Sequence, residues 1–155
     1  MSEVLNAIIA ASAGLAGVAL GAKLNFHAAH KTWVVDNKKL EWRELIDAVQ
    51  EALTRMAYAI YDPPKDAISD QRAKDLSKSV QRVFVVLNNR MFVAEVVARE
   101  KLEDRWNEIN GYVNKVIIPT YRPDEQAMVS FEHERKAFRQ RLNALSRKDL
   151  RIPSD

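Results

Sequence analysis

The sequence predicts an all-α protein in which an apolar N-terminal helix continues into an up-and-down bundle of about four helices. Two observations carry this prediction. Glycine and proline, which interrupt helices, fall at only a few points along the chain. Between those points apolar residues recur at intervals of three and four, the spacing of one helix face. We expect an anchor helix at residues 1–24, a bundle at 25–152 and a disordered tail at 153–155.

The stretch from Leu5 to Ala22 has the composition of a membrane-spanning helix. It contains no charged residue, and only Asn6 and Ser12 are polar. As a helix it would measure roughly 27 Å, close to the roughly 30 Å of a bilayer core. Its many alanines and glycines contribute little transfer free energy, so a helix buried in a soluble oligomer is an open alternative.

The charged residues on either side of this stretch predict its orientation across a membrane. Glu3 is the only charged side chain before it, whereas the residues after it include Lys23, His27, His30 and Lys31. By the positive-inside rule, we expect a single pass through the inner (cytoplasmic) membrane, with most of the chain in the cytosol. A cleaved signal peptide is a further alternative, although no Lys or Arg precedes the stretch. Trp33 fits either an interface anchor or the bundle core.

Small residues in the same stretch indicate a helix that packs against copies of itself. Gly17 and Gly21 form the GxxxG spacing that lets two helix backbones approach closely. The candidate packing residues are Ala10, Ala13, Gly14, Gly17 and Gly21. The competing interpretation is that any helix rich in alanine and glycine contains such spacings by chance.

Four amphipathic segments follow. The first ends at Asp62-Pro63-Pro64, and Ser69 or Asp70 is the expected N-cap of the second. The third ends before Pro119, and Asp124 is the expected N-cap of the fourth. The expected core residues are, in order, Leu40, Leu45, Ile46, Val49, Leu53, Met56, Ala57 and Ile60; Ile68, Leu76, Val80, Val83, Phe84 and Leu87; Leu102, Trp106, Ile109, Val113 and Val116; Met128, Phe131, Phe138, Leu142 and Leu145.

The residues around Asn88 and Asn89 allow a second interpretation. Val83–Leu87 and Met91–Val97 could form two strands joined by a tight turn, because asparagine tolerates the left-handed conformation of a hairpin. Helical patterns lie on both sides, and isolated hairpins are marginally stable. We therefore expect a turn between two helices at Asn88 and Asn89.

Composition excludes several classes of protein. The chain has 155 residues, of which 47% are hydrophobic and 29% charged, which argues against disorder and against a polytopic channel. There is no cysteine, so disulfides, thiolate metal sites and cysteine nucleophiles are excluded. The net charge of +3 is low for a nucleic-acid-binding protein, and we do not expect nucleic acid as a partner.

No catalytic or cofactor motif is found. His27 and His30 lie one turn apart but lack a third ligand nearby, and His133 between two glutamates is expected to be solvated. Glu95, Glu103, Asp104 and Glu108 do not repeat the Glu-x-x-His pairs of di-iron bundles. We expect no metal, no cofactor and no catalysis.

The last helical segment is basic. Positive charge near a helix C-terminus favours the helix dipole, which explains part of this pattern. The functional interpretation is contact with anionic lipid or RNA. The residues concerned are Arg135, Lys136, Arg139, Arg141, Arg147 and Lys148.

The run Lys31-Thr-Trp-Val-Val-Asp-Asn-Lys-Lys-Leu-Glu-Trp-Arg-Glu-Leu, placed directly after a short apolar helix, resembles small bacterial proteins with one N-terminal span and a cytoplasmic helical domain. The resemblance covers about the first third of the chain and concerns layout. It implies a tethered cytosolic bundle, and some proteins of this design act in phage defence or membrane stress. It transfers no functional residue.

From these observations we expect a membrane-tethered, self-associating module that contacts a protein partner without catalysis. Two alternatives stay open. One is an oligomeric effector whose N-terminal helices form a pore. The other is a soluble oligomeric bundle that binds a small ligand or acts as an enzyme.

Overall fold

The computed structural model describes residues 2–61, 70–116 and 125–152; within these ranges the side chains of residues 2–16, 19, 70, 113–116 and 127 are not described. The helices of these ranges are α1 (Ser2–Tyr61), α2 (Asp70–Asn88), α3 (Ala94–Arg99), α4 (Leu102–Val116) and α5 (Glu125–Leu150). No strand occurs in the described ranges, which confirms the all-α prediction for them.

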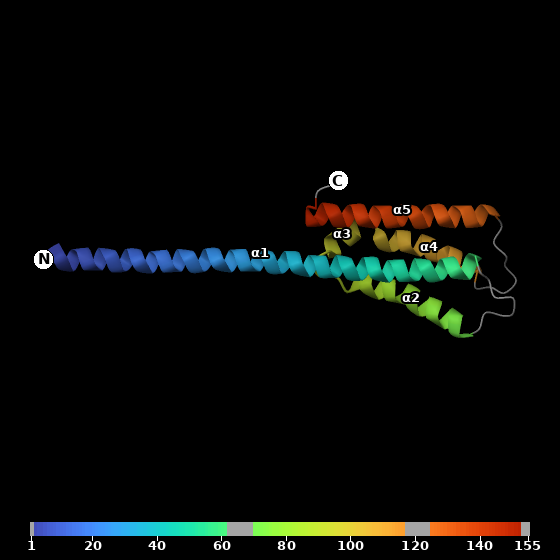
Figure 1. Ribbon diagram of the computed structural model, residues 1–155, viewed down its shortest axis with the longest axis horizontal. Helices are drawn as coiled ribbons and strands as arrows, with labels where there is room; N and C mark the ends of the chain where they lie inside the picture. The colour runs from blue at the N-terminus through green and yellow to red at the C-terminus, as the bar shows by residue number, and fades with distance from the viewer. Residues whose placement is uncertain (1, 62–69, 117–124, 153–155) are drawn as a thin grey trace. The chain divides into compact units, whose positions relative to one another are not determined.

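The chain divides into two units, Met1–Asn37 and Lys38–Asp155, and α1 contributes residues to both. The prediction that the N-terminal helix continues into the first helix of the bundle is confirmed, because α1 is one helix. Within the second unit, α1 and α4 run in one direction and α2 and α5 in the other (Figure 1). This is the predicted up-and-down bundle.

The bundle has one core to which all five helices contribute. The predicted stripes supply most of it, and the buried side chains include Leu45, Val83, Leu102 and Phe131, each fully buried. Core residues recur every three to four positions along each long helix, so each helix buries one face and exposes the other. Ile68, Val113 and Val116, together with the expected N-caps Ser69, Asp70 and Asp124, lie outside the described residues or side chains.

Two residues of α1 depart from the predicted core. Leu40 was expected inside and is 59% exposed, so that prediction is wrong, whereas Trp42 is buried at 1%. The helical repeat gives the reason. Trp42 lies three residues before Leu45 and shares its face, while Leu40 lies five residues before Leu45 and points away from the core.

The predicted turn at Asn88 and Asn89 is confirmed, since α2 ends at Asn88 and the Asn89 amide donates to the Val85 carbonyl at 3.0 Å. The helix expected after it is two helices. Lys101, at φ 50°, adopts the left-handed conformation between α3 and α4, which a continuous helix cannot contain. The break lets Val96 and Val97 bury together with Leu102.

In the part of the chain whose side chains are described, no helix is both long enough and apolar enough to cross a membrane. The predicted span at residues 5–22 lies for the most part outside that part of the chain, as do the side chains of Ala10, Ala13 and Gly14.

Candidate functional site

The Asp149 carboxylate connects the C-terminal end of α5 to the part of α1 where the bundle begins. Asp149 accepts a hydrogen bond from the Lys38 ammonium at 2.8 Å and another from the Trp42 indole N–H at 3.0 Å. An acidic side chain at a helix C-terminus is unfavourable to the helix dipole, and these two donors offset that cost. The C-terminal end of α5 is therefore fixed beside Lys38, the first residue of the second unit.

A second carboxylate caps a helix from a distance of fifty residues. The Glu41 side chain on α1 accepts hydrogen bonds from the backbone amides of Met91, Phe92 and Val93, each at 3.0 Å. Val93 is the N-cap of α3 and makes no side-chain cap of its own. Glu41 thus satisfies the amide of the N-cap Val93, which the helix N-terminus otherwise leaves open, together with the two amides before it, and it fixes α3 against α1.

Arg90 makes further contacts with α1 and α2. Its side chain is 5% exposed and reaches the Glu44 carboxylate at 3.1 Å, the Glu41 carbonyl at 3.4 Å and the Val86 carbonyl. A buried guanidinium is stable only when its donors are satisfied, and these contacts engage its Nε and Nη1 groups. Glu41, Glu44 and Arg90 therefore serve the fold.

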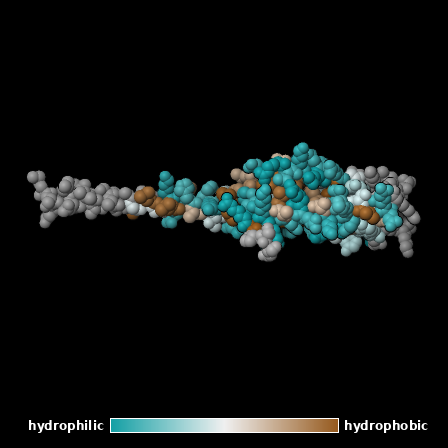
Figure 2. All heavy atoms as spheres, turned by 90° about the horizontal axis from the view of Figure 1, so that it is seen from above, coloured by the Kyte–Doolittle hydropathy of each residue, from teal (hydrophilic) through white to brown (hydrophobic). Residues whose placement is uncertain are grey.

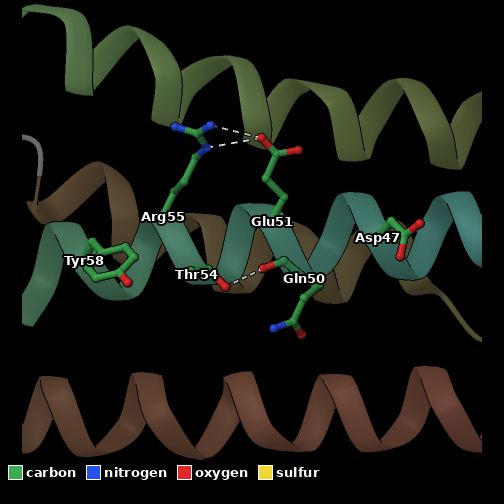
Figure 3. Close-up of a pocket in the computed structure, with 6 residues that line it drawn as sticks. All are labelled: Asp47, Gln50, Glu51, Thr54, Arg55 and Tyr58. Carbon is green, nitrogen blue, oxygen red and sulfur yellow. Dashed lines mark hydrogen bonds and ion pairs between the residues drawn. The ribbon is translucent and has the colours of Figure 1, made fainter.

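An open groove runs along the exposed face of α1, with α2 on one side and α5 on the other (Figure 3). Glu51 and Arg55 point toward α2, where Glu51 pairs with Arg55 at 3.1 Å and with Arg82 at 2.9 Å, whereas Gln50 points toward α5. Tyr58, 68% exposed, lines the groove further along α1. The residues that line the groove are of polar or charged types, but the groove is wide open and their polar groups do not converge on one point in it.

The opposite end of the bundle joins α1 to α5 through a tyrosine. Tyr61 donates to Glu132 at 3.5 Å, and Glu132 also accepts from Arg135. The Arg135 hydrogen bond holds the pKa of the Glu132 carboxyl below its usual range, while burial and then the Glu132 charge raise the pKa of the Tyr61 phenol. Arg135 Nε is buried without a partner among the described residues.

No family model, curated protein or solved structure matches the chain.

The predicted basic residues of α5 separate into two groups. Arg135 pairs with Glu132, and Arg141 pairs with Glu100, whose carboxyl pKa is held low mainly by that hydrogen bond. These two arginines are therefore engaged within the bundle. Four other cations are exposed: Lys136, Arg139, Arg147 and Lys148.

Of the predicted packing residues, the structure describes the surroundings of Gly17 and Gly21. Gly17 is exposed, and a Cβ atom built at either glycine meets no atom within 4 Å. The chain itself therefore does not require glycine at these positions. The prediction that this face packs against a second helix stays a prediction.

The predicted flanking residues Lys23, His27, His30 and Lys31 are all exposed. His30 stacks between Phe26, at 6.4 Å between ring centroids, and Trp33, at 5.9 Å. Trp33 is 52% exposed, so the core alternative for this residue is wrong. Among the described residues no three metal-ligating side chains form a site, and the predicted solvated position of His133 is confirmed by its exposure.

The inward-facing charges Asp149, Glu41 and Arg90 were not predicted from the sequence. Their partners lie 107, 50 and 49 residues away, so no local spacing could pair them. Trp42 could have been found, because its three-residue spacing from Leu45 places it on the core face.

Proposed function

We propose that the chain is a membrane-tethered helical module that self-associates through its N-terminal helix and contacts a protein partner without catalysis. The observation that supports this most directly is the exposure of large apolar side chains on α1. Val18, Leu20, Leu24 and Phe26 are 62–72% exposed. In Figure 2, hydrophobic side chains are visible on this part of α1, whereas the visible surface of the bundle is largely hydrophilic.

These side chains surround the helix. At 100° per residue, Val18 and Phe26 point to one half of the circumference and Leu20 and Leu24 to the other. A single protein partner covers one face, whereas lipid covers every face, so apolar side chains on both halves of the helix suit lipid up to Lys23, the first charged residue after the uncharged run. The uncharged run from Leu5 to Ala22 precedes and includes part of this region. Together they favour a lipid environment.

Membrane tethering predicts that a charge in this region weakens anchoring. Leu20→Lys should move the full chain from the carbonate-resistant membrane fraction toward the soluble fraction, because a lysine costs about 2.5–3.5 kcal/mol of insertion free energy at the centre of a span and a smaller amount near its end, where Leu20 lies. Leu40→Lys is the matched control, since Leu40 is an exposed leucine on the bundle part of α1. It should leave the distribution unchanged.

Release of the unaltered chain by carbonate would overturn the tether. Protease added to spheroplasts tests the direction: the bundle should be protected, because the basic residues after the apolar run favour a cytosolic location. Digestion from outside would reverse the proposed orientation.

Self-association through the small-residue face gives a separate prediction. Gly17→Ile and Gly21→Ile should each abolish cross-linked oligomers in detergent, because a branched side chain prevents the close approach of two helices. Neither substitution meets an atom of the same chain at Cβ, so a loss of oligomers reports on contact between chains. Gly111→Ile on α4, whose Cβ is equally unobstructed, is the control and should leave the oligomers intact. Unchanged oligomers in both N-terminal variants would remove the proposed face.

A pore is the main alternative within a membrane. Oligomeric N-terminal helices that only pack should leave vesicles sealed, so dye retained inside protein-containing vesicles supports the tethered module. Dye leakage that depends on Gly17 and Gly21 would favour the pore.

A further inference from the structure

At the C-terminal end of α5 the basic side chains are exposed, whereas the acidic side chain of Asp149 points into the bundle. Asp149 is the only acidic residue between Asn143 and Ile152, and its carboxylate is turned inward to Lys38 and Trp42. Arg147 and Lys148 on the last turn are exposed, and neither has an acidic partner among the described residues. Arg151, directly after the helix, is also exposed. Asp155 lies outside the described part of the chain.

The neighbouring acids on α1 are engaged in the same way. Glu41 is occupied by the three amides ahead of α3, and Glu44 by the buried Arg90. Both carboxylates are already paired, although the Glu44 side chain is 54% exposed, so they are less available to neutralise other cations. This end of the bundle therefore presents a local positive charge that the chain's net charge of +3 does not reveal.

Arg151 occupies a backbone position that glycine would fill with less strain. Its φ is 55°, and α5 closes with the paired hydrogen bonds of a Schellman motif, from the Ile152 amide to the Arg147 carbonyl at 2.9 Å and from the Arg151 amide to the Lys148 carbonyl at 3.2 Å. Glycine is the usual residue at this left-handed position. Arg151 therefore adds a third cation, beside Arg147 and Lys148, to this end of the helix.

An open hollow lies beside these cations. Its lining includes the amide side chains of Gln140 and Asn143, the cations Arg147 and Lys148, and Ile152, which is 50% exposed. Amide and guanidinium groups donate hydrogen bonds to phosphate oxygens, and an exposed isoleucine beside them can enter the boundary between headgroups and acyl chains. The combination suits a phospholipid headgroup.

We propose that Arg147, Lys148 and Arg151 form a docking surface for anionic phospholipid headgroups, which holds the C-terminal end of the bundle against the membrane. The proposal rests on the tether proposed above. The Lys38 and Trp42 bonds to Asp149 fix this surface beside Lys38, which lies 16 residues, about 24 Å of helix, beyond Ala22, so docking requires α1 to tilt or bend between the apolar run and the bundle. A tethered surface meets its lipid at high effective concentration, so a few cations are enough.

Lipid is favoured over RNA by the size of the surface. Phosphate-dominated RNA binding to a free protein needs many cations, because each neutralised phosphate adds only a modest gain. Three exposed cations on one helix end are few for that purpose. They are enough for a surface already held near an anionic bilayer, where each contributes about five-fold in binding.

The test uses the full chain reconstituted in vesicles. The chain has no cysteine, so Ala144→Cys gives a single site for an environment-sensitive fluorophore at the exposed edge of the hollow. With zwitterionic phosphatidylcholine vesicles the label should report water. With vesicles that also contain phosphatidylglycerol its emission should shift to the blue, and raised salt should reverse the shift, since the attraction between charges is screened.

Two double variants on α5 remove the same charge from different places. Arg147→Gln with Lys148→Gln should lower the ratio of docked to undocked bundle about 25-fold, from two cations at about five-fold each. Lys136→Gln with Arg139→Gln removes one arginine and one lysine about 15 Å away along the helix, and should leave the ratio within about two-fold of the parent. Flotation of carbonate-washed vesicles, measured on every sample, reports the tether separately from docking.

Three results would overturn the docking surface. The first is an equal shift in vesicles with and without phosphatidylglycerol. The second is an equal effect of the two double variants. The third is a shift produced by an added RNA oligonucleotide on zwitterionic vesicles as large as that produced by phosphatidylglycerol. Chains that fail to float with vesicles would instead contradict the tether.

Discussion

Replacing Trp42 by alanine is expected to lower the free energy of unfolding by about 3–5 kcal/mol. The side chain is 1% exposed, and its removal leaves a cavity in the core as well as an unfilled hydrogen-bonding position on Asp149. Domains of this size are stable by only about 5–15 kcal/mol, so the loss should be large enough to leave the bundle marginal. Urea unfolding of the full chain in a fixed concentration of non-ionic detergent, followed by circular dichroism, measures it.

Two variants separate the causes. Trp42→Phe retains most of the buried volume and removes the indole N–H, so it should cost about 2 kcal/mol, the contribution of a hydrogen bond to a charged group. Trp33→Ala is the control, because Trp33 lies on the same helix and is 52% exposed, and should change stability by no more than about 0.5 kcal/mol. Equal losses in Trp42→Ala and Trp33→Ala would contradict the placement of Trp42 in the core.

The Glu41→Ala variant is expected to lose about 2–4 kcal/mol of stability, because it deprives three backbone amides of their acceptor at once. Met91, Phe92 and Val93 donate those amides, and Val93 is fully buried. The effect should be concentrated at α3. Hydrogen exchange of the amides at residues 91–97 should accelerate more than that of α5.

Two further variants separate the loss of the hydrogen bonds at Glu41 from the loss of a carboxylate as such. Glu41→Gln keeps one oxygen acceptor and should cost about half as much as the alanine variant, since two of the three hydrogen bonds share one oxygen. Glu51→Ala removes a carboxylate from the same helix whose partners are the exposed side chains of Arg55 and Arg82, and should cost less than about 1 kcal/mol. If Glu51→Ala and Glu41→Ala lowered the free energy of unfolding equally, the hydrogen bonds of Glu41 to the start of α3 would contribute no more than an exposed ion pair.

The periodic features of this chain could be predicted without its structure. Apolar spacing located the buried faces of α1, α2, α4 and α5, and the prolines placed the breaks between α1 and α2 and between α4 and α5. Both follow from local geometry, since a side chain's direction on a helix depends only on its position in the repeat. The split between α3 and α4 was missed because Lys101 takes a conformation that its residue type does not favour.

Charge placement had to come from the tertiary structure. In the sequence, α5 carries an even series of cations, yet Arg141 is paired with Glu100 of another segment, and Asp149 neutralises Lys38 rather than its own neighbour Lys148. The physical reason is that an ion pair depends on the distance between two groups in space, which folding sets through contacts a hundred residues apart. The sequence by itself determined the helices, their buried faces and the apolar N-terminal run. Only the packing of the helices decided which charges stabilise the bundle and which remain at its surface.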